Sequence, residues 1–569
     1  MKNVRKNLRI YIVLSLLALT FFAILTKIAY LQVFNKEFFK NLAYSQYIAV
    51  VSLKGERGKI YDREGRILAM DLTTYSVYAD PQLVEDKDKF CKEVAEVLEI
   101  DREKIKKKLY SPKRFVWIKR KISWEEKEKV EKLKLKGLGF IREKKRFYPH
   151  GSLAAHILGG VDLDNRGIEG IEFFYERYLQ GKEGITTVFK DSSASTFTFH
   201  PQVFHPQKGA DIFLTIEAQI QYWSESYLKE TVEKFKAKAG SVIVMDASNG
   251  ELLALANWPT FDPNRIGEFM PSQVRNRAIT DIFEPGSVFK IVTLVTAIAE
   301  GKFSPQKVIF CERGKYKIPG SILHDWKPYG ELTFKEVFKK SSNIGVAKIA
   351  QSLPPFSLYT YMKKLSFGRK TDIDLPGETS GILKSPQKWS KTSYFIIPIG
   401  QEVGVSLIQL ASAMATIANG GYKVRPHLVR KIWHGESFWE FKPHKKRVLP
   451  SKVAENVREV LKEVVEEGTG KLARIDGAVV GGKTGTAQKF DVEKKRYSHT
   501  RYRASFVGFI QKDSHPLVIA VSIDEPVKSH FGGVVAAPLF KKIGENILKY
   551  REYKAMVEKK GEVSLIEKM

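Results

Sequence analysis

An uncharged apolar run near the start of the chain limits what the whole sequence can fold into. Residues 10–26 read IYIVLSLLALTFFAILT and contain no charged side chain. As a helix they span about 25 Å, near the minimum for crossing a bilayer, and the apolar pattern resumes after Lys27. A cleaved signal peptide is the alternative, but no small-x-small cleavage pattern directly follows the run. We therefore predict one transmembrane anchor over residues 10–34.

The distribution of positive charge predicts the direction of this anchor. Lys2, Arg5, Lys6 and Arg9 precede the run, and positively charged segments stay on the cytoplasmic side of a membrane. Residues 1–9 are then a cytoplasmic tail, and the rest of the chain lies outside the cell membrane. No second run approaches this length, which predicts a single-pass topology.

The formal net charge of +30 and the two cysteines restrict the class of partner. The basic residues are scattered among many glutamates, which is typical of a solvated surface. The sequence has no zinc-finger, RNP-type or helix-turn-helix signature, so we expect no nucleic-acid partner. Cys91 and Cys311 lie outside any Cys/His cluster. This predicts two free, buried thiols, no metal site and no cofactor.

The texture of the sequence changes near residue 206. Residues 35–205 mix short strands with Lys/Glu-rich helices, whereas residues 206–550 combine apolar helices with strands. Helices around a largely antiparallel sheet predict an α+β domain. Residues 551–569 form a charged tail that we expect to fray. The elements predicted in the larger domain are a strand pair over 241–257 with its turn at Asn249-Gly250, buried helices over 287–301 and 407–421, and strands over 477–490, 504–510 and 517–526.

Three short motifs follow one another in the larger domain. They are Ser287-Val288-Phe289-Lys290, Ser341-Ser342-Asn343 and Lys483-Thr484-Gly485-Thr486. A Ser-x-x-Lys pattern is weak alone, since it occurs three further times in this chain. The second and third motifs occur once each, in a fixed order after the first. We interpret the three as one active site for acyl transfer.

The first motif supplies a nucleophile and its base. Positions i and i+3 share one face of a helix, so Lys290 lies beside Ser287. Ser287 enters the first helical turn, where backbone N–H groups favour developing negative charge. The apolar residues after Lys290 bury its amine, which should lower its pKa toward neutrality and make it a general base.

The second and third motifs bind and relay. In an extended turn, Ser341 and Asn343 can face one cleft, where Ser341 relays a proton and Asn343 bonds a peptide amide. Gly485 leaves room for a substrate lying along its strand. Lys483, with the hydroxyls of Thr484 and Thr486, can hold a terminal carboxylate.

At these residues the sequence resembles the class B penicillin-binding proteins. That resemblance implies a penicillin-binding, serine β-lactamase-like transpeptidase domain over 206–550 and a pedestal (dimerisation-type) domain over 35–205. The Glu284–Lys290 and Ser341–Lys348 stretches look closer to the division (FtsI-like) type than to the elongation type. Besides the motifs, the matching segments are 57–69, 146–172, 275–290, 339–350 and 399–421, with Ser406 standing where threonine is usual.

The resemblance also implies a reaction and a place. Ser287 attacks the D-Ala-D-Ala carbonyl of a stem peptide, the backbone N–H groups of Ser287 and Thr486 hold the oxyanion, and a second stem peptide resolves the acyl-enzyme. Penicillins acylate the same serine. The expected location is the bacterial inner membrane with a periplasmic catalytic domain. The implied partners are a lipid-linked precursor, a SEDS-type glycosyltransferase and other division proteins.

Several alternatives remain beside septal cross-linking. An elongation-type transpeptidase, a β-lactam hydrolase or sensor and a non-catalytic scaffold each fit part of the pattern. No Glu-x-x-x-Asn motif of class A β-lactamases lies between Asn343 and Lys483, and the glycosyltransferase signature of bifunctional members is absent. In the pedestal, Arg57, Asp62, Arg63 and Glu172 are candidates for structural or partner-facing roles, which the sequence leaves open.

Overall fold

The computed structural model describes residues 2–40, 48–53, 55–190, 196–197, 205–302, 304–491, 493, 496–512 and 515–566. The chain divides into two compact units. One consists of residues 1–56 and 180–209, and the other of residues 57–179 and 210–569. The predicted pedestal, residues 35–205, is therefore shared between the two units.

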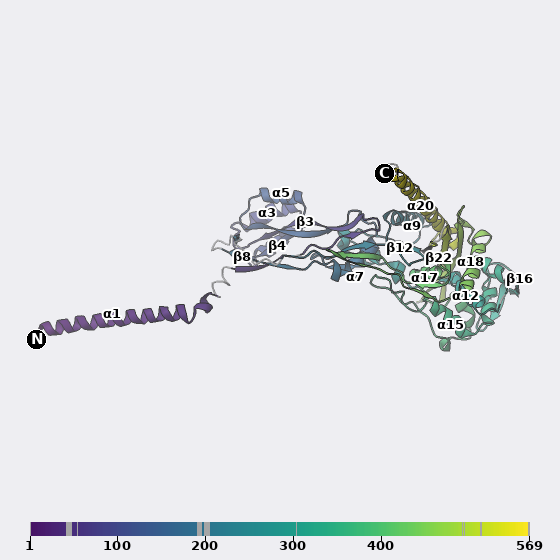
Figure 1. The fold of residues 1–569 in the computed structure, drawn as a ribbon, viewed down its shortest axis with the longest axis horizontal. Coiled ribbons are helices and arrows are strands. Elements are labelled where there is room, and N and C mark those ends of the chain that lie inside the picture. Colours follow the sequence, from purple (N-terminus) through teal and green to yellow (C-terminus); the bar gives the residue numbers. More distant parts are fainter. Residues whose placement is uncertain are drawn as a thin grey trace. The chain divides into compact units, whose positions relative to one another are not determined.

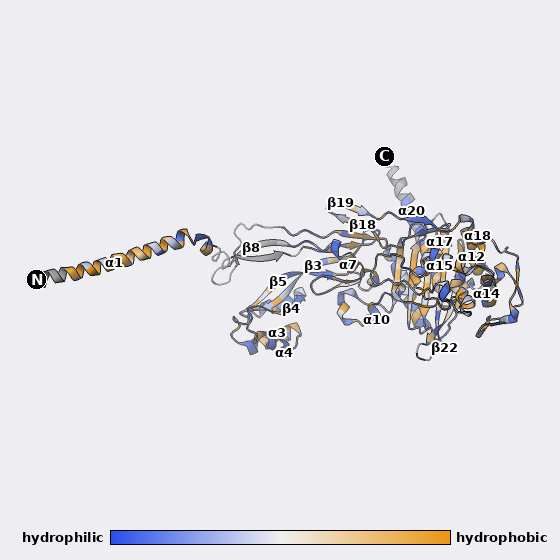
Figure 2. Cartoon of the chain, turned by 90° about the horizontal axis from the view of Figure 1, so that it is seen from below, coloured by the Kyte–Doolittle hydropathy of each residue, from blue (hydrophilic) through white to orange (hydrophobic). Residues whose placement is uncertain are grey.

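The first unit contains the predicted membrane anchor. Helix α1 (Lys2–Val33) includes residues Ile10–Val33, a stretch with a mean hydropathy of 2.3 that is long and apolar enough to cross a membrane. Figure 2 shows apolar residues along most of this helix. No other helix in the described part of the chain meets these criteria, which fits single-pass anchoring. The same unit holds a small antiparallel sheet of β1 (Ile48–Leu53), β8 (Gly184–Lys190) and β9 (Thr196–Phe197).

The pedestal part of the second unit is a sheet covered by helices. Three helices supply an apolar core with Phe90, Val94 and Leu98 of the first helix fully buried. A capping box between Ser123 and Glu126 begins the third helix. The elements are β2 (Ile60–Tyr61), β3 (Ile67–Ala79), β4 (Val116–Ile122) and β5 (Leu138–Phe147), with α3 (Lys87–Leu98), α4 (Arg102–Leu109) and α5 (Trp124–Lys132).

A seven-stranded sheet joins the pedestal part of the second unit, residues 57–179, to residues 210–569, which we call the transpeptidase part after the domain predicted there. Strand β10 (Asp211–Leu214) pairs in parallel with β2 and antiparallel with β18 (Val429–His434). Strand β19 (Ser437–Glu440) ends the sheet beside β18. Strands from both parts of the chain therefore share one hydrogen-bonded ladder.

The transpeptidase part is built on a five-stranded antiparallel sheet in the order β12-β11-β23-β22-β21. One face packs against α9 (Ala218–Lys234) and α20 (Ala537–Ile566), and the other against α12 (Lys290–Ala299), α17 (Leu407–Ala418) and α18 (Ser451–Glu466) (Figure 1). The predicted α+β class and the predicted strands are confirmed. The strands are β11 (Ala239–Asp246), β12 (Leu252–Trp258), β21 (Val479–Asp491), β22 (Arg496–Gln511) and β23 (Leu517–Asp524).

Shorter elements connect these layers. They are α6 (Ala155–Leu158), β6 (Gly160–Val161), β7 (Gly167–Glu169), α7 (Gly170–Phe174), α8 (Glu176–Leu179), η1 (Pro263–Glu268), α10 (Pro271–Val274), α11 (Arg277–Thr280), β13 (Val308–Phe310), η3 (Glu312–Gly314), β16 (Glu331–Thr333), η4 (Pro386–Lys388), α16 (Ser393–Ile396), η5 (Ile397–Ile399), η6 (Lys471–Ala473) and α19 (Gly532–Val535).

The expectation that the tail frays from residue 551 is wrong. Helix α20 continues to Ile566, and Lys554 forms ion pairs with Glu64 and Glu217. These two carboxylates hold the start of the tail in place. Cys91 and Cys311 are buried and free, as predicted.

Arg57 and Glu172, two of the four pedestal residues singled out in the sequence, belong to a buried cluster of ion pairs. Arg57 and Arg146 both form ion pairs with the buried Glu172, each at 2.6 Å, and Arg146 also pairs with Asp71 at 3.2 Å. We call Arg57, Asp71, Arg146 and Glu172 the pedestal ion cluster. Burial raises the pKa of the Glu172 carboxyl, but Arg146 and Arg57 together hold it below its usual value.

Asp62 and Arg63, the other two pedestal residues singled out in the sequence, stabilise a turn and a junction. Asp62 Oδ1 accepts hydrogen bonds from the backbone N–H groups of Glu64 and Arg66, both at 2.8 Å. Arg63 lies 3.2 Å from Glu251, which belongs to the transpeptidase part. These contacts favour a structural role over direct contact with a partner.

Candidate active site

The nucleophile candidate lies at the entrance of a buried helix. A 3₁₀ turn, η2 (Gly286–Phe289), leads directly into α12. In a 3₁₀ turn side chains i and i+3 eclipse, so Ser287 and Lys290 share a face as predicted. Gly286 has φ +51°, and a Cβ there would lie 3.2 Å from the Cβ of Ala487. Glycine thus lets this turn approach strand β21 closely.

Lys290 is fully buried among neutral acceptors. Its Nζ donates to the Ser341 carbonyl oxygen at 2.7 Å, to Ser341 Oγ at 3.2 Å and to Asn343 Oδ1 at 2.7 Å. Burial lowers the pKa of Lys290 to about 7, against an opposing effect of Asp325. The predicted direction of the pKa shift agrees with this. Among the described residues, Ser287 Oγ forms no hydrogen bond with the lysine, which is held by the second motif instead.

The second motif differs from the predicted extended turn. Ser341 has φ +57°, in the left-handed region, directly after α13 (Phe334–Lys339). Asn343 begins α14 (Asn343–Gln351), for which Ser342 is the N-cap. The Asn343 amide is already engaged, since its Nδ2 donates to the His324 carbonyl oxygen at 2.8 Å. Both Ser341 and Asn343 still line one cleft.

Sequence reasoning missed the residue that supports this motif. Asp325 follows β15 (Ser321–His324), which pairs with β14 (Lys315–Ile318). Its carboxylate accepts from Ser342 Oγ at 2.6 Å and from the backbone N–H groups of Asn343 and Ile344. No spacing pattern in the sequence connects Asp325 to the motif, because the contact depends on tertiary structure.

Lys483 lies behind the cleft instead of lining it. It sits on β21, an edge strand of the five-stranded sheet, and is 1% exposed. Its Nζ donates to Ser341 Oγ at 2.9 Å. Burial and the nearby Lys290 lower its pKa well below the usual lysine value. One hydroxyl, that of Ser341, therefore lies between two buried lysines.

We expected Gly485 to leave room for substrate, but the structure places other atoms of the protein in that space. A Cβ at this position would lie 2.4 Å from Ser505 Oγ, 2.8 Å from Val288 Cγ2 and 2.9 Å from the Pro285 carbonyl oxygen. The residue therefore faces the nucleophile turn, and its small size permits that packing.

The two threonines of the third motif do face the cleft. Thr484 Oγ1 lies 3.0 Å from Thr469 Oγ1, and Thr486 Oγ1 accepts from the Gly532 N–H at 3.0 Å. The alternation of a β-strand explains this division, because successive side chains point to opposite sides. Lys483 and Gly485 pack inward, whereas Thr484 and Thr486 border the open space.

The three motifs meet at a cleft of about 800 Å³. Besides motif residues, it is bordered by Glu284, Trp326, Thr469, Tyr502 and His530, none of which was a candidate site residue in the sequence. The Tyr502 and His530 rings stack at 4.2 Å between centroids and form one wall. A hydroxyl nucleophile, depressed lysine pKa values and bordering hydroxyls suit acyl transfer.

Comparisons with known proteins agree with this chemistry. A family model of the penicillin-binding protein transpeptidase domain matches residues 240–545, and one of the penicillin-binding protein dimerisation domain matches residues 52–214. The chain belongs to the class B penicillin-binding proteins. Its relatives in this family are peptidoglycan D,D-transpeptidases.

Full-length relatives and a solved structure extend the match beyond single domains. The chain is 34% identical over 549 residues to a probable peptidoglycan D,D-transpeptidase, PenA, of Neisseria gonorrhoeae, covering 95% of this chain and 92% of the relative. It is 31% identical over 547 residues to peptidoglycan D,D-transpeptidase FtsI of Escherichia coli K12, covering 94% and 90%. Penicillin-binding protein 3 of Mycobacterium tuberculosis, in complex with aztreonam, matches with a TM-score of 0.70 at 28% identity, covering 88% and 97%.

Proposed function

We propose that this class B transpeptidase cross-links stem peptides during septal wall synthesis, with Ser287 as nucleophile, and that β-lactams acylate the same serine. The observation that carries the proposal is the Ser341 hydroxyl, which lies 2.9 Å from Lys483 Nζ and 3.2 Å from Lys290 Nζ in the cleft that Ser287 borders. This arrangement offers both a base and a proton path beside the nucleophile.

The proposed reaction begins with proton removal from Ser287. Lys290 has a pKa of about 7, so a large share of it is neutral near neutral pH. The neutral amine accepts the hydroxyl proton as Ser287 Oγ attacks the penultimate D-alanine carbonyl. The backbone N–H groups of Ser287 and Thr486 stabilise the oxyanion. As the C–N bond breaks, Ser341 donates its hydroxyl proton to the departing D-alanine amine and regains a proton from Lys290, which becomes neutral again. An amine of a second stem peptide then attacks the ester, Lys290 takes the proton that this amine loses, and Ser287 Oγ leaves and regains that proton.

The third motif would orient the donor peptide. The hydroxyls of Thr484 and Thr486 border the cleft and can donate to the terminal carboxylate. Lys483, buried behind them, would act through Ser341 rather than by direct contact with the carboxylate. Asn343 would contact the peptide only if its bonds to Lys290 and His324 rearranged.

The carboxylates of the cleft support slow hydrolysis of a penicillin adduct. Glu284 Oε1 accepts from the Glu402 N–H at 2.9 Å and from the Tyr497 hydroxyl at 3.1 Å. Asp325 is occupied by the second motif. Both oxygens of Asp325 and Oε1 of Glu284 are thus committed to structural hydrogen bonds, which favours a transpeptidase over a β-lactam hydrolase.

The membrane arrangement and partners complete the proposal. The four cations at the start of α1, before its apolar stretch Ile10–Val33, favour a cytoplasmic N-terminus and an extracytoplasmic cleft at the bacterial inner membrane. Because the sequence lacks a glycosyltransferase signature, a separate SEDS-type enzyme of the division machinery would polymerise the glycan from lipid-linked precursor.

Labelling with a fluorescent penicillin tests the proposal directly. We expect one stable adduct, mapped by mass spectrometry to the peptide that contains Ser287. Ser287→Ala should prevent labelling, whereas the matched control Ser385→Ala should not. Ser385 also belongs to a Ser-x-x-Lys pattern yet lies outside the cleft. Label on another residue, or rapid release of hydrolysed penicillin, would exclude the proposed role. Filamentation of cells depleted of the protein would distinguish septal from elongation function, for which rounding is expected.

A further inference from the structure

A second cavity in the transpeptidase part is lined by cations. It has a volume of about 530 Å³ and lies between α15 (Pro355–Lys364) and the two-stranded ribbon of β17 (Tyr422–Val424) and β20 (Lys445–Arg447). No aspartate or glutamate lines it. Its basic lining residues are Lys363, Lys364, Arg369, Lys423, Lys446 and Arg447.

The ribbon places two of these lysines in an unfavourable position. Lys423 and Lys446 are directly opposite each other across the strand pair. Like charges in directly opposite positions destabilise a β-ribbon. A local arrangement that costs stability without a compensating contact points to a functional site.

The six cations have no ion pair among the described residues, although many other lysines and arginines of this chain do. Lys363 Nζ donates to the Gly368 carbonyl oxygen at 3.3 Å, and Arg369 donates to the Lys363 carbonyl oxygen. Lysines near the end of α15 also complement its helix dipole. These contacts explain the positions of Lys363, Lys364 and Arg369 but leave the Lys423–Lys446 pair uncompensated.

Two acidic residues lie near Lys423, and neither pairs with it. The Glu378 carboxylate accepts from the backbone N–H and hydroxyl of Thr371, at 2.6 and 2.7 Å. Burial lowers the pKa of Lys423, and Arg369 and Lys446 lower it further, while Asp372 and Glu378 oppose the shift. The positive charge at this cavity is thus only partly balanced by the protein.

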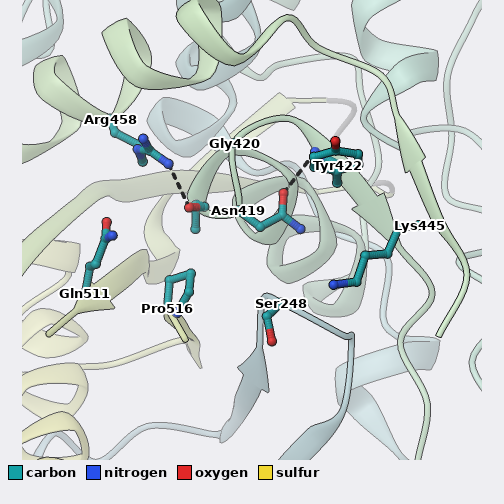
Figure 3. Close-up of a pocket in the computed structure, with 9 residues that line it drawn as sticks. Ser248, Asn419, Gly420, Tyr422, Lys445, Arg458, Gln511 and Pro516 are labelled. Atoms are coloured by element: carbon teal, nitrogen blue, oxygen red, sulfur yellow. Dashed lines mark hydrogen bonds between the residues drawn. The ribbon is translucent and has the colours of Figure 1, made fainter. Parts of the chain in front are cut away.

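A neighbouring hollow of about 560 Å³ shows the contrast (Figure 3). There Arg458 donates to the Ala418 carbonyl oxygen at 3.0 Å, and the Asn419 side chain accepts from the Tyr422 N–H. Lys445 and Arg458 are its two cations, and the remaining lining groups are neutral. This hollow therefore has two cations, against six in the cavity of Lys423 and Lys446.

We propose that the cavity lined by Lys423 and Lys446 binds a diphosphate group. Diphosphate oxygens accept several charge-assisted hydrogen bonds at once, and the lysine ammonium and arginine fork are the usual donors to them. The volume is within the range of small-ligand sites. The group can come from free pyrophosphate or from the head of an isoprenyl diphosphate lipid, since both present the same anion.

Calorimetric titration of the full chain in non-ionic detergent tests the proposal at constant ionic strength. Inorganic pyrophosphate is the first probe, and geranyl diphosphate, short enough to stay monomeric, is the second. We expect saturable binding that Lys423→Gln/Lys446→Gln weakens at least about tenfold. The control Lys104→Gln/Lys107→Gln removes the same charge from exposed positions on α4 and should leave the affinity within about twofold.

The melting temperature shows whether a loss of affinity in Lys423→Gln/Lys446→Gln comes from a lost ligand contact or from misfolding. Without ligand, Lys423→Gln/Lys446→Gln should melt no lower than the parent, because it removes cross-strand repulsion. Tighter binding of geranyl diphosphate would identify a lipid source, and equal affinity a free diphosphate. Absence of saturable binding by both probes, or an equal loss in the control variant, would overturn the proposal.

Discussion

The catalytic cleft and the pedestal ion cluster both bury charged side chains, but with opposite results. In the cleft, Lys290 and Lys483 contact a hydroxyl, a carbonyl oxygen and an amide, and neither forms an ion pair within the described residues. In the pedestal ion cluster two arginines face two carboxylates. Burial without a counter-ion favours a neutral amine and provides a base, whereas burial with matched counter-ions keeps the charges and joins segments.

The largest expected effect breaks the cleft and spares the pedestal. Ser287→Ala should reduce penicillin acylation by a factor on the order of 10⁴ or more, because it removes the attacking atom. The melting temperature should stay close to that of the parent, since Ser287 Oγ has no hydrogen bond among the described residues. Stopped-flow labelling and calorimetry check both points. Retention of acylation above one per cent would contradict the assignment.

The second effect breaks the pedestal and spares the cleft. Glu172→Gln leaves two buried guanidinium groups short of a counter-charge and should lower the free energy of unfolding by about 3–5 kcal/mol. Urea denaturation measures this loss. Acylation per folded molecule should not change. The control Glu131→Gln removes the exposed partner of a helical ion pair with Lys127 and should cost less than about 0.5 kcal/mol.

A third variant tests the packing behind the nucleophile. Gly485→Ala places a methyl group within 3.0 Å of Ser505, Val288 and Pro285. The turn that carries Ser287 must shift, at a cost of about 1–3 kcal/mol, and acylation should slow by about tenfold or more. Gly267→Ala, where the added Cβ meets no atom within 4 Å, is the matched control. Equal acylation rates in the two variants would show that Gly485 has no role in positioning Ser287.

The pH dependence sharpens the same comparison. Only the neutral amine of Lys290 can accept a proton, so acylation should fall about tenfold for each pH unit below its pKa of about 7. Between about pH 7 and 10 the unfolded chain binds this proton and the folded chain does not. The free energy of unfolding should therefore rise with pH by up to about 1.4 kcal/mol per unit, and Lys290→Met should lack this part of the slope. A rate independent of pH from 5 to 9 would exclude Lys290 as the base.

The smallest effect concerns the pair that joins pedestal and transpeptidase part. Arg63 and Glu251 have side chains that are 26% and 11% exposed. Such partly solvated pairs contribute little, so Arg63→Gln should lower the free energy of unfolding by less than about 1 kcal/mol. A loss as large as that of Glu172→Gln in the same urea experiment would mean that Arg63 belongs with the buried cluster.

Local patterns predicted the elements and much of the chemistry. The strand pair around Asn249-Gly250, the helices beginning near Ser287 and Leu407, and the direction of the Lys290 pKa shift all follow from residues close in sequence. Features that depend on distant contacts were missed or wrong. Asp325 supports the second motif across a turn, and the inward packing of Gly485 depends on Val288, so neither has a periodic signal.

The left-handed conformation of Ser341 belongs to the same group. Nothing in Ser341-Ser342-Asn343 requires φ +57°, and the sequence alone favoured an extended turn. Tertiary contacts maintain it, because the Ser341 carbonyl oxygen accepts from Lys290 and its hydroxyl accepts from Lys483. A strained backbone held at an active site is a common exception to local rules.

The parallel pairing of β10 with β2 has a mechanical consequence. Ile212 pairs with Ile60 and Phe213 with Tyr61, while the other edge of β10 bonds β18. A load applied to pedestal strand β2 is carried by ladder hydrogen bonds into the 429–434 strand, without a flexible linker between them. Cutting the chain between its two family domains would separate β10 from β18. Each half would then expose one unpaired strand edge, so neither would keep its native surface.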